Sequence, residues 1–217
     1  MSPVLDAKDQ ELKTVSRKLR KMLNGQPVVV KNAAHLHGLA AGLKHGEVVI
    51  EGHSGDYLGV LNDGATITVK GDAGKYLADN MTRGRVLVEG NADYGAGQYC
   101  YGGTVVVKGN AGDFTATMNK GATIIIGGDV GSEAGTYMLA GDLVIVGDAG
   151  ANLGNYLIRG NIYVGGEWAS LGHNTRLEPL TEEDVHKLEG YFAEHGIQAD
   201  AHGFHKLAPL SAKPFYK

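Results

Sequence analysis

The sequence has 217 residues, a formal net charge of −4 and a pI near 6.1, so no overall positive charge indicates a nucleic-acid-binding protein. The single cysteine, Cys100, excludes an internal disulfide and is typical of a reducing compartment. No apolar run approaches the roughly 18 residues of a membrane span, and the N-terminus lacks the apolar core of a signal peptide. We therefore expect a cytoplasmic protein that binds neither nucleic acid nor membrane.

Residues 1–45 are expected to form an N-terminal helix and cap. Within them, residues 9–23 place five apolar side chains on one face of a helix, namely Leu12, Val15, Leu19, Met22 and Leu23. Five basic side chains occupy the rest of this helix. A solvated face on a capping helix is the simpler interpretation. The alternative is a docking surface in which Lys13, Arg17 and Arg20 contact an acidic partner.

Residues 46–167 contain a repeat of 19 residues. One glycine recurs at this interval without a gap, at Gly52, Gly71, Gly90, Gly109, Gly128, Gly147 and Gly166. Two and four residues before each glycine the side chain is aliphatic, and this period of two is typical of one strand face. Each unit is then one coil of a solenoid whose strands pair in parallel about 4.8 Å apart. We predict an all-β fold, a parallel β-helix of about seven coils with a capping helix at each end.

The recurring glycines are expected at the corners of the coils, where the chain turns with no room for a Cβ atom. In the five central repeats the next residue is an aspartate or asparagine, at Asp72, Asn91, Asn110, Asp129 and Asp148. Such side chains hydrogen-bond their own turn and tolerate the left-handed region. Stacked carboxylates at Asp129, Asp148 and Glu167 could also bind a cation, but corner turns account for the two aspartates without one.

The residues that precede four of these glycines alternate in charge, as Glu51, Lys70, Glu89 and Lys108. On stacked coils they would be neighbours, and opposite charges on neighbouring strands stabilise by ~0.2–1 kcal/mol per pair. We interpret this charge ladder as structural rather than as a binding site. Other positions form rows by the same stacking: Met81, Cys100, Met138 and Leu157 form an interior row, and Tyr57, Tyr76 and Phe114 form a row of stacked aromatic rings.

Other solenoid classes fit the sequence less well. Hexapeptide helices need a six-residue subperiod, and 19 is not a multiple of six. The leucine-and-asparagine consensus of leucine-rich repeats and the tandem G-G-x-G-x-D of calcium-binding nonapeptide repeats are both missing.

Residues 168–217 are expected to form a C-terminal helix and an extended tail. Thr181 can cap the helix, acidic residues fill its first turn, and Val185, Leu188 and Phe192 mark its buried face. The tail from 201 lacks periodicity, and we expect it to lie on a partner, with Phe204 and Phe215 as candidate docking residues.

No catalytic constellation is visible in the sequence. The phosphate-loop and dinucleotide-binding glycine motifs are missing, and "GHSG" at 52–55 is only a near miss for a nucleophile elbow. His35 and His37 have no companion ligand at zinc-like spacing. We therefore assign no catalytic, cofactor-binding or metal-binding residue. Two functional classes remain open: a non-catalytic subunit that spaces other proteins, and a β-helix enzyme or binder that acts on extended polymers. Constant coils leave no room for the insertions that build a cleft in the second class.

The repeat G-x-[VI]-x-[VI]-x-G-x-A-G resembles the GXGXG domain at the C-terminal end of the glutamate synthase large subunit. The similarity extends from about Val29 to Ile197 and includes "HLHGLAAGLKHGEVVIEGHSGDYLG" and "GDLVIVGDAGANLGNYLIRGNIYVGGEWASLGHNTR". It implies a right-handed parallel β-helix without catalytic residues. Because the domain here stands on its own chain, the resemblance is to split relatives such as N-methylglutamate synthase and archaeal-type glutamate synthases. The β-helix subunit of formylmethanofuran dehydrogenase is a more distant relative.

This resemblance implies a structural subunit of a hetero-oligomeric enzyme. Its partners would be a glutamine-amidotransferase-like subunit and a flavin synthase subunit, and the FMN and iron–sulfur clusters would belong to a partner. One cysteine cannot ligate an iron–sulfur cluster. The alternatives are the β-helix subunit of a formylmethanofuran dehydrogenase or formyltransferase/hydrolase complex and, in another class, a stand-alone solenoid binding protein.

Overall fold

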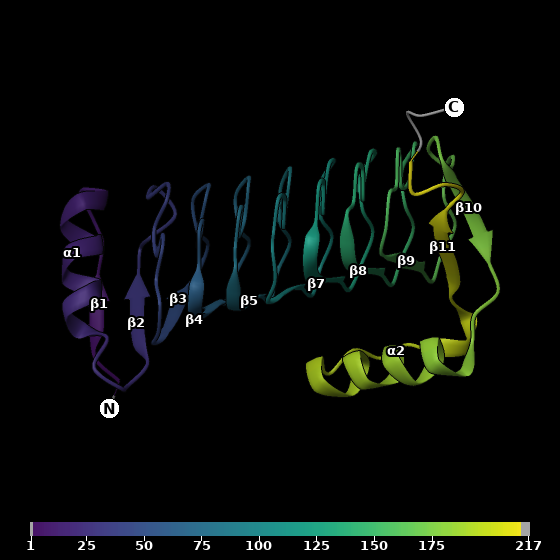
Figure 1. Ribbon diagram of the computed structural model, residues 1–217. Coiled ribbons are helices and arrows are strands. Elements are labelled where there is room, and N and C mark those ends of the chain that lie inside the picture. The colour runs from purple at the N-terminus through teal and green to yellow at the C-terminus, as the bar shows by residue number, and fades with distance from the viewer. Residues whose placement is uncertain (1, 214–217) are drawn as a thin grey trace.

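The computed structural model describes residues 2–213, and in them the chain forms a parallel β-solenoid on one sheet of eleven strands (Figure 1). The first nine strands follow in chain order: β1 (Val4–Asp6), β2 (Val28–Lys31), β3 (Glu47–Glu51), β4 (Asp63–Val69), β5 (Arg83–Val88), β6 (Thr104–Val107), β7 (Lys120–Ile126), β8 (Ala140–Ile145) and β9 (Asn161–Val164). The remaining elements are α1 (Leu12–Met22), β10 (Thr175–Glu178), α2 (Glu182–His195), the short 3-10 helix η1 (Ala201–Gly203) and β11 (His205–Pro209). The predicted fold class, an all-β parallel solenoid, is confirmed.

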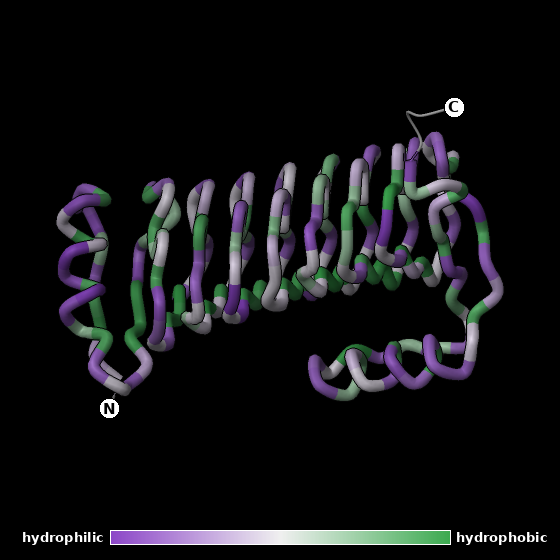
Figure 2. Tube along the Cα trace, viewed as in Figure 1, coloured by the Kyte–Doolittle hydropathy of each residue, from purple (hydrophilic) through white to green (hydrophobic). Residues whose placement is uncertain are grey.

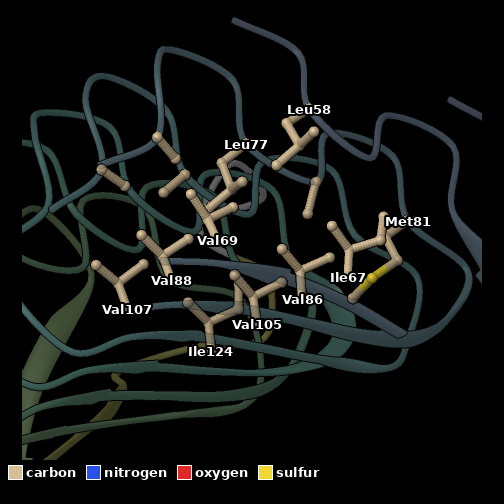
Figure 3. Close-up of a cluster of buried hydrophobic side chains, with 14 of the residues drawn as sticks. Leu58, Ile67, Val69, Leu77, Met81, Val86, Val88, Val105, Val107 and Ile124 are labelled. Carbon is tan, nitrogen blue, oxygen red and sulfur yellow. The ribbon is translucent and has the colours of Figure 1, made fainter. Parts of the chain in front are cut away.

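The strands pair in the register that the 19-residue repeat predicts. Val48 lies opposite Ile67, Ile67 opposite Val86, and the same step continues to Ile162 in β9. Each aliphatic position therefore forms a column inside the solenoid, as Figure 3 shows for Ile67, Val86 and Val105. These side chains are fully buried. A slip of one residue would turn the whole column to the other face of the sheet, so burial fixes the register.

The sheet begins earlier than the glycine repeat. β2 also pairs in parallel with β3, but Val28 lies opposite Val48, a step of 20 residues. At the corner after β2, Asn32 stands in the place of Gly52 and adopts a φ of 58°, a left-handed conformation that asparagine tolerates. The extra residue and the missing glycine hide this coil from a search for a strict 19-residue period.

A second wall of the solenoid is built from turns with left-handed residues. The small residue that lies seven positions after six of the corner glycines has a positive φ in every case, at Gly59, Ala78, Gly97, Ala116, Gly135 and Gly154. The space for a side chain is limited there, since a Cβ atom on Gly97 would lie 2.7 Å from Ile124 Cδ1. The N–H of Gly97 donates to the carbonyl of Leu77 one coil earlier, at 2.8 Å, so this wall is also hydrogen-bonded from coil to coil.

The C-terminal helix lies along the outer face of the sheet, beneath the later strands, and not over the end of the solenoid (Figure 1). Its predicted buried face is confirmed: Val185, Leu188 and Phe192 form one core with the outward side chains of β6–β9, which are Val106, Ile125, Val144 and Tyr163. Because these outward positions are apolar, the later strands are apolar on both faces and need a cover. The end of the solenoid is instead closed by β11, which pairs antiparallel to β9, and by β10, which pairs antiparallel to β11.

The N-terminal helix covers the other end of the solenoid (Figure 1). Val15 and Leu19 are buried in the main core, and Leu12 and Met22 pack against it. The opposite side of the helix is hydrophilic (Figure 2). The helix therefore caps the first coil with its apolar face and presents its basic face to solvent.

Candidate interaction surface

The corner glycines and the residues that follow them form one hydrogen-bonded ladder along the solenoid. Asp72 Oδ1 accepts a hydrogen bond from the N–H of Asn91, one coil later, at 2.8 Å. Asn91, Asn110, Asp129 and Asp148 repeat this contact with the next coil, each at 2.8 Å. The expectation that these side chains bond their own turn in the left-handed region is therefore wrong. None of the five has a positive φ, and each satisfies a backbone donor of the following coil.

The same ladder explains why the corners need glycine. A Cβ atom on Gly90 would lie 2.3 Å from Asp72 Oδ1, and one on Gly128 would lie 2.0 Å from Asn110 Oδ1. Any side chain at these corners would displace the oxygen that holds the next coil. Among the seven corner glycines only Gly52 has a φ in the left-handed range, 102°. At the later corners the requirement for glycine comes from close approach between coils.

Two carboxylates of this ladder already accept hydrogen bonds from backbone N–H groups. The cation alternative rested on Asp129, Asp148 and Glu167, but the first two each hold a backbone N–H. Across residues 2–213, no group of three or more His, Cys, Asp or Glu side chains is placed to hold a metal ion. Histidine begins two such ladders, since His53 Nδ1 accepts from the N–H of Asp72 at 2.9 Å and His37 Nδ1 accepts from that of Asp56 at 3.0 Å.

The charge ladder forms two separate ion pairs and not one continuous series. Lys70 Nζ lies 2.5 Å from Glu89 Oε1, and Glu51 pairs at 2.8 Å with Lys31, one coil before the predicted ladder. Lys108 lies near the C-terminal end of α2. A Cβ atom on Gly196, which caps that end, would be 3.8 Å from the ammonium nitrogen of Lys108. The four paired side chains are about half exposed, so each pair contributes at most ~1 kcal/mol.

The predicted rows of side chains are present, with one addition. Cys100 is fully buried in the core with Met81, Met138 and Leu157. In the aromatic row, the rings of Tyr57 and Tyr76 stack with centroids 4.7 Å apart. Tyr94 lies between Tyr76 and Phe114, at 5.5 and 5.2 Å. The repeat does not predict Tyr94, because it stands one position before the repeat position, which Gly95 occupies.

Neither of the two nucleophile candidates, Ser54 and Cys100, has the surroundings that activate a nucleophile. The Ser54 hydroxyl is buried without a hydrogen-bond partner, so no base is in reach. Burial raises the pKa of the Cys100 thiol to about 12, which makes it a poor thiolate ligand. As the chain's single cysteine, it does not fit an iron–sulfur cluster.

Neither helix in residues 2–213 has the length and apolar character that a membrane crossing requires.

Two buried carboxylates fasten α2 to the sheet, and sequence reasoning missed both. Asp184 accepts hydrogen bonds from Tyr163 Oη at 2.6 Å and Lys206 Nζ at 2.9 Å, and it closes a capping box with Thr181. Burial alone would raise the pKa of Asp184, but the hydrogen bonds from Tyr163, Thr181 and Lys206 outweigh it and hold the pKa below its usual range. Asp184 stands three residues after Thr181, which is the sequence signal for a capping box.

The second carboxylate is Asp142, on β8. It accepts hydrogen bonds from Tyr191 Oη at 2.9 Å and Asn161 Nδ2 at 3.0 Å, and Lys187 Nζ lies 3.4 Å away. Burial, together with the charge of Asp142, raises the pKa of Tyr191 to about 12. The hydrogen bond from the Tyr191 hydroxyl to Asp142 joins α2 to β8.

The surface with unbalanced charge is the outer face of α1. Its cationic side chains are all exposed: Lys13, Arg17, Lys18, Arg20 and Lys21. In residues 2–213, seven lysines and arginines form ion pairs with carboxylates, and all seven lie outside this helix. Within α1, Arg20 donates to the carbonyl of Ala41 and Lys18 to Gln10 Oε1. We call this face, defined by those five residues, the basic helix face.

The predicted docking residues in the tail are not part of such a surface. Phe204 is buried, and its ring packs on Phe192 at a centroid distance of 5.3 Å. It belongs to the core under α2, so its assignment to partner docking is wrong. Phe215 lies outside the described residues.

The fold and its surfaces define a parallel β-solenoid protein stabilised by ladders between coils. The sequence matches the model of the GXGXG motif family over residues 7–200, and the chain belongs to that family. A comparison with curated proteins finds no match.

Proposed function

We propose that this chain is a non-catalytic structural subunit of a multi-subunit FMN and iron–sulfur enzyme of the glutamate synthase type. In this proposal it bridges a glutamine-amidotransferase-like subunit and a flavin synthase subunit in the cytoplasm, as in N-methylglutamate synthase or glutamate synthase. Membership of the GXGXG family supports an association of this kind. The cofactors would belong to the partners.

The observation that carries the proposal is the basic helix face. Its five like charges on three turns of helix repel one another, and nothing in residues 2–213 compensates them with a carboxylate. The chain as a whole carries a net charge of −4, so this positive charge is local to α1. An acidic partner surface over the basic helix face would be attracted to it, because complementary charge speeds and orients association. The partner surface is therefore expected to be rich in Asp and Glu.

The first test is affinity purification of the chain from its own organism, followed by native mass spectrometry and a visible spectrum. Co-purifying subunits with flavin and iron–sulfur absorbance support the proposal, and the partner masses distinguish the glutamate synthase type from the formyl-transfer type. A colourless chain recovered alone would contradict it and favour the stand-alone binding protein.

Charge reversal on α1 tests the docking surface itself. We expect Lys13→Glu with Arg17→Glu to lose most of the co-purifying partner, because it replaces attraction by repulsion, without changing the thermal unfolding midpoint. A matched control is Lys75→Glu with Arg159→Glu, which makes the same charge change at exposed positions away from this helix. Equal retention of the partner by both variants would exclude the basic helix face as the docking site.

A further inference from the structure

The two ends of the sheet are finished differently. At the N-terminal end, α1 lies beside β1 and covers the first coil (Figure 1). At the C-terminal end, β10 is the last strand in the sheet order, and among residues 2–213 it pairs with β11 on one side alone. Natural proteins usually cover or blunt such an edge. Here the strand at the edge carries Leu177, which is 49% exposed, and Leu210 beside it is 62% exposed.

The register of β10 shows which backbone groups face outward. The N–H of Leu210 donates to the carbonyl of Asn174, so these two residues form a hydrogen-bonded pair of the antiparallel ladder. Such pairs alternate along the strand, which assigns Arg176 and Glu178 to the ladder with β11. Thr175 and Leu177 then direct their N–H and C=O groups to the open edge.

The sequence of β10 is complementary to itself. Arg176 and Glu178 stand on either side of Leu177, and they form an ion pair within the strand. Two antiparallel copies centred on Leu177 would place Arg176 of each opposite Glu178 of the other on one face. On the other face the two Leu177 side chains would be direct neighbours. Pro179, which lacks an N–H, would offer its carbonyl to Thr175 of the other copy.

We propose that two copies of this chain associate through β10 about a twofold axis, so that their sheets join end to end. The exposed Leu177 and the unpaired edge groups are then covered by the same contact. An interface of this kind is isologous and closes on itself, so it yields a dimer and not a fibre. The contact involves one four-residue strand in each copy, so we expect a weak dimer. This inference does not depend on the proposed function.

A disulfide across the twofold axis tests the geometry. Opposed residues of a hydrogen-bonded antiparallel pair have Cα atoms about 5.5 Å apart, within disulfide reach. Leu177→Cys is therefore expected to cross-link to a covalent dimer when copper phenanthroline oxidises the two thiols. Leu61→Cys is the matched control, because the Leu61 side chain is also exposed, to 57%, and lies on the wall of the solenoid that is built from turns, away from β10. Cys100 is buried and contributes no background.

Charge exchange tests the register. Arg176→Glu should weaken the dimer about tenfold in a sedimentation-equilibrium series, since each of two cross-strand pairs becomes repulsive. Glu178→Arg should do the same, and the variant with both changes should recover the wild-type constant. A wild-type chain that stays monomeric at high concentration would overturn the proposal. So would cross-linking of Leu177→Cys to a different subunit in native extract, which would assign the edge to that partner's strand.

Discussion

At the scale of the residue, the solenoid depends on pairs that act between coils. The oxygen of an aspartate or asparagine crosses a corner glycine and accepts the N–H of the next coil, as Asn110 does with Asp129 at 2.8 Å. The glycine and the acceptor therefore depend on each other, because the Asn110 oxygen occupies the space that a side chain at Gly128 would fill. The requirement for glycine at these corners comes from the close contact between neighbouring coils and not from a left-handed backbone conformation.

A double-mutant cycle should show this coupling. Asn110→Ala is expected to lower the free energy of unfolding by ~1 kcal/mol, because it removes one hydrogen bond. Gly128→Ala should cost more in the wild-type background, where the new Cβ meets the Asn110 oxygen, and less in the Asn110→Ala background. Urea denaturation measures all four proteins. Additive losses would show that the two positions are independent.

The buried carboxylate of Asp184 makes stability depend on pH. The pKa of Asp184 is held below its usual value in the folded chain. At pH values between the folded and the unfolded pKa, the unfolded chain therefore binds more protons than the folded chain, and stability rises with pH. The contribution is present above about pH 4 and is lost as the pH falls toward the folded pKa. We expect Asp184→Asn to lower stability at pH 7 and to flatten the decline below pH 4 in urea titrations. An unchanged acid limb would assign that decline to other groups.

At the scale of the element, α2 is the part whose position the repeat alone does not predict. Its N-cap and buried face follow from local sequence, and Thr181 and Leu188 behave as expected. Its placement on the outer face depends on the outward residues of β6–β9, which are fully buried from Val106 onward, while the earlier Thr68 and Leu87 in the same row are half-buried. The apolar character of this row was readable from the sequence, but the partner of each apolar face was not, because no local pattern states which surfaces meet.

Truncation of the α2 interface should loosen one half of the molecule selectively. Leu188→Ala removes a fully buried side chain and is expected to cost ~2–5 kcal/mol. Hydrogen exchange should then accelerate in α2 and in β6–β9 more than in β3–β5, because coils contact only their neighbours. Glu189→Ala changes the adjacent exposed residue and serves as the control. Uniform acceleration along the sheet would show that the solenoid unfolds as one unit.

At the scale of the whole molecule, the strict repeat made the coil architecture predictable from glycine and aliphatic spacing alone. The features that escaped prediction are those that break the repeat: the 20-residue step at Val28, the antiparallel closure by β11 and the buried polar contacts of Asp142. Each depends on a contact between segments that share no pattern.

The constant step permits a direct test by deletion. Removal of residues 72–90 takes out one unit of 19 residues and should leave a shorter protein with a cooperative unfolding transition, because the flanking columns rejoin in register. Removal of 73–90, one residue fewer, would turn one set of side chains to the wrong face and should abolish cooperative unfolding by circular dichroism. Equal folding of both deletions would mean that the register is not fixed by the aliphatic columns.

The same regularity limits how the length of this protein can change. Its ends, the basic helix face and the β10 edge, are separated by a stack whose height is the number of coils multiplied by about 4.8 Å. An insertion inside a strand shifts its side chains out of their columns, so the separation of the ends varies in whole coils and not gradually. Any two bodies attached to those ends would be held at one of a discrete set of distances, and a relative with one coil more would hold them one strand spacing further apart.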